Sequence, residues 1–291
     1  MEPTGALLTL LLVSRAAQGP PATDIYLAEL RGRAGRLEIG TPVNATHRPG
    51  YDNQPFFVAD GRSFVYTAVV DGQADVFRYE IATGQRVRLT ATPESEYSPT
   101  PLPDGSGFSV VRVEADSTQR LWRFAWDGTH PALVLPNVKP VGYHAWGDAH
   151  TVALFVLGQP ATLQLAETRT GTTAQIAADI GRGLQAVPGR GAITFVQKGA
   201  DSAWSIAELD LPTRAVRPLV RTLKGVDLFA RTPDGVLLMA QGSKVYQWSP
   251  ARGTEWEEVA DFAGAGLENI TRLAVSPRGD RLALVAADPK P

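Results

Sequence analysis

QPFFVADGRSFVYTAVVDGQADVFRYEIATGQRVRLT, residues 54–90, has the pattern of four short strands joined by tight turns. The runs 56–58, 63–70, 75–81 and 85–89 are rich in β-branched and aromatic residues or alternate apolar with polar positions. Asp60-Gly61, Asp71-Gly72 and Thr83-Gly84 separate these runs, and in each the glycine tolerates a positive φ that other residues avoid. The segment therefore predicts a four-stranded antiparallel meander.

The same unit recurs along the chain. Counterparts of its first turn fall at Gly61, Gly105, Ala149, Gly191, Gly235 and Gly279. Successive positions are 44, 44, 42, 44 and 44 residues apart. A period of about 40–45 residues with four strands per unit is typical of a β-propeller blade. The six turns predict an all-β fold, a six-bladed β-propeller of four-stranded antiparallel blades.

The two ends of the repeat region complement each other. The last unit contains only two strand patterns, at 271–275 and 281–286. DIYLAEL at 24–30 matches DVFRYEI at 75–81 in character, and residues 36–39 match 86–89. We therefore expect the N-terminal hairpin to complete the sixth blade and close the ring, which removes free sheet edges. Residues 23–288 are predicted to form a single domain.

Composition narrows the classes of function. The chain has 291 residues, 44% of them hydrophobic, and a formal net charge of −2 from 28 basic and 30 acidic residues. This balance argues against nucleic acid as the partner, because phosphate binding depends on positive charge. The absence of cysteine excludes disulfides and thiol chemistry.

An apolar run, ALLTLLLV at residues 6–13, lies near the N-terminus. It is too short to span a bilayer, so no transmembrane segment is predicted. The run and the small residues that follow it fit a signal peptide over residues 1–22. The alternative is a disordered or helical N-terminal tail.

Motifs for catalysis and metal binding are missing from the sequence. No Gly-x-Ser-x-Gly, P-loop or His-Glu-x-x-His pattern occurs, so no catalytic residue is predicted. The four histidines are scattered, without companions at ligand spacing, so neither a metal site nor a cofactor is predicted. Gly181-Arg182-Gly183 is interpreted as a tight turn rather than a phosphate loop, because it has no third glycine and no following helix.

Four short motifs occur in order: Asp60-Gly61, Asp75-Val76-Phe77, Thr83-Gly84 and Arg88-Leu89-Thr90. Together they resemble the TolB-like (WD40-like) propeller repeat. The resemblance extends over about residues 24–288. It implies a periplasmic or secreted six-bladed ring that binds other molecules through its funnel mouth. The expected protein is a monomer whose partner is a protein or small ligand of the cell envelope.

Loops that precede the inner strands are expected to form this mouth, because loops on a rigid frame carry function. By alignment of the repeats, the candidate binding residues are Asp52, Asn53, Gln54, Tyr97, Ser98, Tyr143, His144, Gln185, Asp227 and Arg272. The first hypothesis is a non-catalytic binding or scaffold protein that uses these residues.

Two other functions remain open from the sequence alone. A propeller enzyme of the lactonase, lyase or glycosidase type would place carboxylates and amides, with a calcium ion, on the central axis. Asp52, Asn53 and Asp227 are the acid and amide candidates for such a site. The other alternative is the ligand-binding ectodomain of a sensor.

Overall fold

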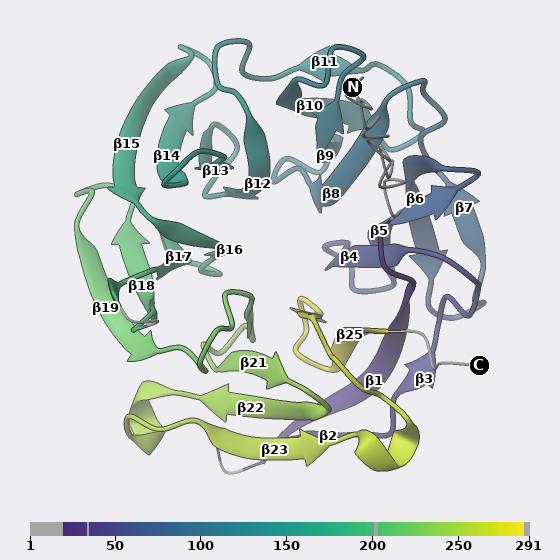
Figure 1. The fold of residues 1–291 in the computed structure, drawn as a ribbon, viewed down its shortest axis with the longest axis vertical. Coiled ribbons are helices and arrows are strands. Elements are labelled where there is room, and N and C mark those ends of the chain that lie inside the picture. The colour runs from purple at the N-terminus through teal and green to yellow at the C-terminus, as the bar shows by residue number, and fades with distance from the viewer. Residues whose placement is uncertain (1–19, 34, 201–202, 288–291) are drawn as a thin grey trace, which may run out of the picture.

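Six small antiparallel sheets stand around a central axis in the computed structural model, which describes residues 20–33, 35–200 and 203–287 (Figure 1). The six-bladed all-β architecture predicted from the repeat is confirmed. Residues 1–19 of the predicted signal peptide lie outside the described residues. No helix in the described part of the chain is long and apolar enough to cross a bilayer.

Each blade runs from an inner strand at the axis to an outer strand at the rim. The first blade contains β4 (Asp52–Phe57), β5 (Ser63–Val70), β6 (Gln73–Glu80) and β7 (Arg86–Arg88). The second contains β8 (Ser95–Pro101), β9 (Gly107–Val113), β10 (Gln119–Ala125) and β11 (Ala132–Leu133). The third contains β12 (Val141–Trp146), β13 (Thr151–Val156), β14 (Thr162–Glu167) and β15 (Thr172–Ala178).

The other three blades follow in chain order. The fourth contains β16 (Ile180–Ala186), β17 (Ala192–Gln197), β18 (Ser205–Asp210) and β19 (Val216–Arg221). The fifth contains β20 (Ala230–Arg231), β21 (Leu237–Gln241), β22 (Lys244–Trp248) and β23 (Glu257–Asp261), with short 3-10 turns at Pro250–Arg252 and Ala263–Ala265. The sixth contains β24 (Arg272–Val275), β25 (Arg281–Ala287), β1 (Thr23–Arg33) and β2 (Arg36–Ile39).

The sixth blade joins the two ends of the repeat region, as the sequence predicted. β1 pairs antiparallel with β25, and Tyr26 lies directly opposite Leu284. A fifth strand, β3 (Val43–Asn44), was not expected. β2 pairs with β1 only from Leu30 onward, which leaves an open edge where β3 pairs with Tyr26 and Leu27. The chain thus covers the exposed edge of its longest strand.

The core lies between neighbouring blades. In β5 the six residues from Ser63 to Ala68 are all buried, because both faces of this strand contact other blades. Ile25, Phe64 and Val285 belong to one apolar cluster that joins the sixth blade to the first. Each large side chain buried in this way contributes about 1.5–3 kcal/mol. Packing between blades therefore stabilises the ring, and the central axis is left for side chains of the inner strands.

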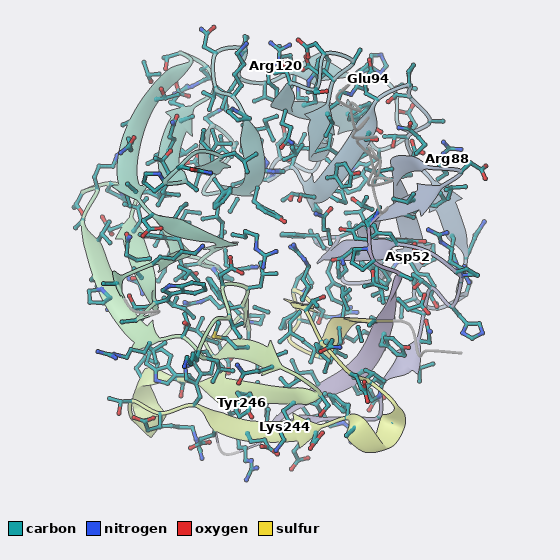
Figure 2. The ribbon with its side chains drawn as sticks, viewed as in Figure 1. Asp52, Arg88, Glu94, Arg120, Lys244 and Tyr246 are labelled. Atoms are coloured by element: carbon teal, nitrogen blue, oxygen red, sulfur yellow. The ribbon has the colours of Figure 1, made fainter. Side chains whose placement is uncertain are left out.

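Charged residues gather at the outer rim. Arg88, Arg120 and Lys244 all lie there, far from the axis (Figure 2). Lys244 forms an ion pair of 2.8 Å with Glu258, and both side chains are more than 40% exposed. Exposed pairs of this kind contribute about 0–1 kcal/mol each. The rim is therefore a solvated surface, and the stability of the ring comes from the apolar contacts inside it.

Candidate functional site

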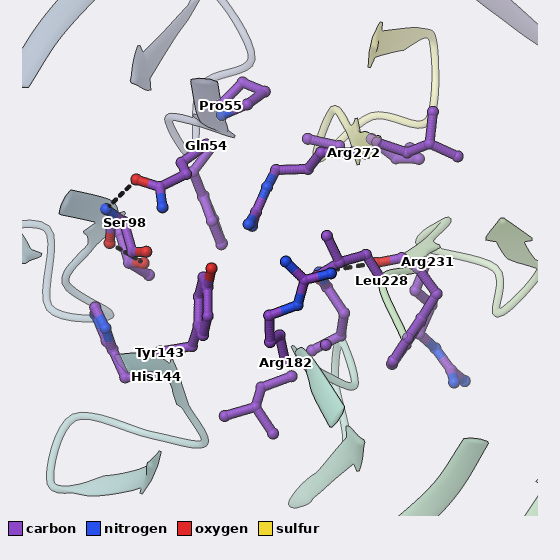
Figure 3. Close-up of a pocket in the computed structure, with 18 of the residues that line it drawn as sticks. Gln54, Pro55, Ser98, Tyr143, His144, Arg182, Leu228, Arg231 and Arg272 are labelled. Carbon is purple, nitrogen blue, oxygen red and sulfur yellow. Dashed lines mark hydrogen bonds between the residues drawn. The ribbon is translucent and has the colours of Figure 1, made fainter. Parts of the chain in front are cut away.

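A pocket lies on the central axis, between the inner edges of the six blades (Figure 3). Its cavity volume is about 100 Å³. Every blade contributes to its wall, and the six blades in order are represented by Gln54, Ser98, Tyr143, Arg182, Leu228 and Arg272. The pocket therefore depends on the closed ring and would not exist on an isolated blade.

Irregularities in the inner strands turn side chains toward this pocket. The register of β4 shifts between Asn53 and Phe56, and β8, β12 and β16 carry similar shifts near their starts. Such bulges bend a strand and re-aim its side chains. Gln54 and Ser98 occupy equivalent positions of successive repeats, and both adopt positive φ, 59° and 53°. Residues other than glycine hold this conformation at a cost of about 1–3 kcal/mol, and it is concentrated at functional sites.

Gln54 links the first two blades at the pocket wall. Its Oε1 accepts a hydrogen bond of 2.7 Å from the backbone N–H of Ser98 (Figure 3). Asn53 supports the bend from behind, since its Oδ1 accepts a bond of 2.7 Å from the N–H of Gln54. These bonds satisfy backbone donors that the irregular strands cannot pair within their own sheets. The amide of Gln54 is thus fixed in place at the mouth.

Arg182 and Asp227 form an ion pair between the fourth and fifth blades. Arg182 Nη2 donates to Asp227 Oδ1 at 2.7 Å, and its Nε donates to Oδ2 at 3.0 Å. Burial alone would raise the pKa of Asp227, but the hydrogen bonds and charge of Arg182 lower it. The same bonds raise the pKa of Arg182. A bidentate pair of this kind holds the guanidinium in one orientation.

Gly181 and Gly183 allow Arg182 to reach this position. A Cβ on Gly181 would lie 2.7 Å from the Cβ of Asp227, and one on Gly183 would lie 2.6 Å from the Asp227 carbonyl oxygen. Side chains at these two positions would therefore push the strand away from Asp227. Gly181-Arg182-Gly183 lies within the bulged strand β16, so its interpretation as a tight turn was wrong.

Arg272 and Tyr143 face each other across the pocket. The guanidinium carbon of Arg272 lies 5.3 Å from the centre of the Tyr143 ring, within the range of a cation–π contact. The Tyr143 hydroxyl points toward the space between Arg182 and Arg272 (Figure 3). Tyr51 lies close to this group, and burial raises its pKa to about 12 even though the charge of Arg272 acts to lower it. At neutral pH Tyr51 is therefore a neutral hydrogen-bonding group.

His144 lies in the pocket wall above a buried polar network. Its Nε2 lies 2.7 Å from Ser109 Oγ, and Trp146 Nε1 donates to the same oxygen at 2.9 Å. Burial lowers the pKa of His144 to about 3, so the imidazole is neutral at pH 7. Ser109 is fully buried. This serine–histidine pair therefore cannot present a nucleophile to a substrate, and it serves to orient the imidazole.

Polar atoms without partners are concentrated in this pocket. Among the described residues, eight buried side-chain nitrogen or oxygen atoms lack a hydrogen-bond partner. Four of them belong to residues of the pocket wall: Ser98 Oγ, His144 Nδ1, Arg231 Nε and Arg272 Nε. Because these four atoms are themselves sealed from solvent, they cost about 1–3 kcal/mol each and are not contact points for a ligand in the open pocket.

Known proteins resemble this chain in structure alone. No family model and no curated protein matches the sequence. The structure of a TolB from Agrobacterium tumefaciens superposes with a TM-score of 0.71 at 16% identity, covering 94% of this chain and 100% of that one. The fold is the TolB-like six-bladed propeller. TolB from Acinetobacter baumannii gives a TM-score of 0.60 at 13% identity, covering 92% of this chain and 65% of that one.

Proteins other than TolB also have the TolB-like fold. An oligogalacturonate lyase in complex with manganese superposes with a TM-score of 0.55 at 15% identity, covering 94% of this chain and 81% of that one. At such identities the fold is what is shared, and fold does not determine activity. The residues of the pocket therefore decide what it can bind.

Six of the ten residues predicted from the repeat alignment line the axial pocket of this TolB-like fold. They are Gln54, Ser98, Tyr143, His144, Gln185 and Arg272. Their predicted placement on loops was wrong, because all six belong to the inner strands β4, β8, β12, β16 and β24. β4, β8, β12 and β16 are bulged, whereas β24, which carries Arg272, pairs regularly with β25.

The other four predicted residues do not line the pocket. Asp227 lies in the loop before β20 and holds Arg182, and Asn53 supports the bend at Gln54. Tyr97 is half-buried in β8. Asp52 is fully buried and forms an ion pair of 2.7 Å with Arg48. Asp52 and Asn53 in β4 and Asp227 before β20, the candidates for a calcium site, therefore act as structural groups in different blades.

Acidic and histidine side chains do not gather into a metal cluster within residues 20–33, 35–200 and 203–287. Sequence reasoning also missed fourteen pocket residues, among them Phe56, Arg182 and Arg231. The one available signal was an arginine between two glycines at 181–183, which indicates a backbone that must approach another segment closely.

Asp52 is expected to make stability fall as pH rises. Burial raises its pKa to about 6, while Arg48 acts to lower it. Between the ordinary pKa of about 4 and the raised value, the folded state holds a proton that the unfolded chain has released. Relative to Asp52→Asn, the wild type should therefore lose up to about 3 kcal/mol of unfolding free energy between pH 4 and pH 7. Urea unfolding at several pH values measures this difference.

Asp116→Asn is the control for this pH dependence. Hydrogen bonds from Thr118 lower the pKa of this exposed carboxylate, so its contribution to stability is lost as pH falls. The two substitutions should change the pH profile in opposite directions. A pH profile for Asp52→Asn parallel to that of the wild type would contradict the raised pKa.

Proposed function

We propose that this protein is a non-catalytic recognition or scaffold protein of the cell envelope or of the secreted fraction, and that its ligand enters the axial pocket. The observation that carries the proposal is an open axial pocket whose wall is formed by all six blades. The resemblance to the TolB repeat and the TolB structures supports the periplasmic or secreted location.

The chemistry of the pocket favours binding over catalysis. The guanidinium of Arg182 is already neutralised by Asp227, and His144 is neutral and fixed by Ser109. No aspartate or glutamate belongs to the pocket wall among the described residues, so it offers no carboxylate as general base. The fixed donors and apolar side chains of the wall are suited to holding a ligand in one orientation.

Site-specific photo-crosslinking tests the location of the binding site. Phe56 lines the pocket and is 42% exposed, so p-benzoyl-phenylalanine in its place would contact a bound ligand. Val216, 43% exposed in the outer strand β19, is the matched control position. In cells that make the protein, we expect a discrete adduct from position 56 and none from position 216. Adducts from position 216 alone, or identical adducts from both, would overturn the proposed site.

A lyase is the second candidate, favoured by one observation. Oligogalacturonate lyase structures share this fold, and the axial pocket here is lined by arginines, which would suit an acidic sugar. Incubation with oligogalacturonate, with and without manganese or calcium, tests this candidate. Accumulation of unsaturated uronate, lost in Tyr143→Phe, would favour the enzyme and contradict the non-catalytic proposal.

A further inference from the structure

The axial pocket carries an excess of positive charge. Arg182 and Arg272 turn their guanidinium groups toward the central space, whereas that of Arg231 points away from it and lies beside Gly235 (Figure 3). No aspartate or glutamate lies in the pocket wall among the described residues. Only Arg182 has a carboxylate partner at the pocket, Asp227, which lies behind the wall. His144 adds no charge because burial keeps it neutral at pH 7. A space of low polarity with unbalanced cations attracts an anion.

Arg272 is the group most ready to receive that anion. It is partly buried, its Nε has no hydrogen-bond partner, and within the described chain it forms no ion pair. Its contact with the Tyr143 ring fixes the plane of the guanidinium and leaves the nitrogen donors unused. Paired donors of an arginine match the two oxygens of a carboxylate. A bound carboxylate would balance the unpaired charge of this guanidinium.

Neighbouring groups would complete the carboxylate site. The side chains of Arg182 and Tyr143 face the same space as Arg272 (Figure 3). Tyr143 interacts with Arg182 and contributes to the raised pKa of that guanidinium. Its hydroxyl can donate to a carboxylate oxygen while Arg182 supplies a second, partly neutralised positive charge. Three donors from two opposite sides of the ring would therefore meet one anionic group.

The remainder of the pocket wall favours an apolar attachment to that carboxylate. Phe56 is 42% exposed, and Leu228 is also partly exposed in the wall. The wall contains no carboxylate, the strongest acceptor for sugar hydroxyls, and the Oε1 of Gln54 is already occupied by Ser98. Aromatic and aliphatic side chains of a peptide match Phe56 and Leu228 without further hydrogen bonds.

We propose that the axial pocket recognises an acidic peptide, in which one carboxylate binds Arg272 and Tyr143 while a flanking apolar side chain contacts Phe56 and Leu228. This inference rests on the proposed function and specifies its ligand. The bulged inner strands would surround the acidic residue, and the flanking residues of the peptide would lie across the mouth.

Calorimetric titration with blocked tripeptides tests the proposal. The probes are acetyl-Phe-Glu-Phe-amide, its Phe-Gln-Phe counterpart, which has the same shape without the charge, and digalacturonate. The wild type should bind the glutamate peptide at least tenfold more tightly than the glutamine peptide. Arg272→Gln should lose this discrimination, and Arg272→Lys should retain part of it, since lysine offers charge without the paired geometry. Arg86→Gln, an exposed arginine of β7, should behave as wild type.

The outcomes separate this inference from the proposed function. Equal affinity for the two peptides, or no peptide binding in a protein that still gives the adduct from position 56, would overturn the acidic-peptide inference and leave the proposed site standing. Preference for digalacturonate over the glutamate peptide would also overturn it. A melting temperature for Arg272→Gln within a few degrees of wild type shows that the loss of discrimination comes from the missing guanidinium.

Discussion

Oxidation of a Glu29→Cys/Arg281→Cys variant is expected to lock the ring shut and raise its free energy of unfolding by about 3–5 kcal/mol. The two residues lie opposite each other where β1 pairs with β25, and the next N–H, that of Leu30, bonds the carbonyl of Asp280. Glu29 and Arg281 thus form a non-hydrogen-bonded pair, in which side chains approach closely enough for a disulfide. The link would close a loop of about 250 residues, which strongly restricts the unfolded chain.

The protein has no cysteine of its own, so only the two introduced cysteines can form a disulfide. Urea unfolding of the oxidised and reduced variant gives the stabilisation directly. Arg31→Cys/Arg281→Cys is the matched control, because Arg31 lies two residues further along β1 and pairs with Glu38 of β2 instead. The control should form little intramolecular disulfide. Failure of the Glu29 pair to cross-link would contradict the closure of the sixth blade.

Gly128→Ala should cost about 3 kcal/mol or more. Gly128 lies in the outer turn between β10 and β11 of the second blade, with φ of 78°. A Cβ there would overlap the carbonyl oxygen of Leu89, which follows β7 of the first blade. Because backbone cannot move aside as a flexible side chain can, the two blades would have to separate locally. Chemical denaturation measures the loss.

Gly105→Ala separates this clash from the cost of positive φ. Gly105 has nearly the same φ, 72°, but a Cβ at this position would meet nothing within 4 Å. Its substitution should cost about 1 kcal/mol, the conformational part alone. Equal destabilisation by the two variants would show that the outer turn of the second blade does not press against the first.

The fold could be predicted from sequence because one local pattern is repeated. The Asp60-Gly61 turn and its counterparts recur at nearly constant spacing, and each turn is specified by residues adjacent in the chain. The pairing of β1 with β25 was predictable because the last repeat contains only two strand patterns and the N-terminal hairpin supplies the other two. β3 could not be predicted, because its two residues, Val43 and Asn44, lie in a polar stretch and pair only where β1 extends beyond β2.

The site was only partly predictable, for a different reason. Repeat alignment assigns equivalent positions, so Gln54 and Ser98 were found together. Arg182 was missed because the register of β16 shifts between Ile180 and Leu184, and a shift of register changes which side chains face the axis. Asp52 and Asp227 seemed available in the sequence, but each is paired with an arginine that only the folded chain brings near.

The pairing of β1 with β25 has a consequence for biosynthesis. β1 is translated first, yet its partner strand ends at Ala287, so one edge of β1 has no native neighbour until nearly all of the chain has been made. At about 5–20 residues per second, the delay before residue 287 emerges is on the order of tens of seconds. During that interval β1 waits for its partner strand. It is therefore the segment that needs a chaperone for extended polypeptide for the longest time.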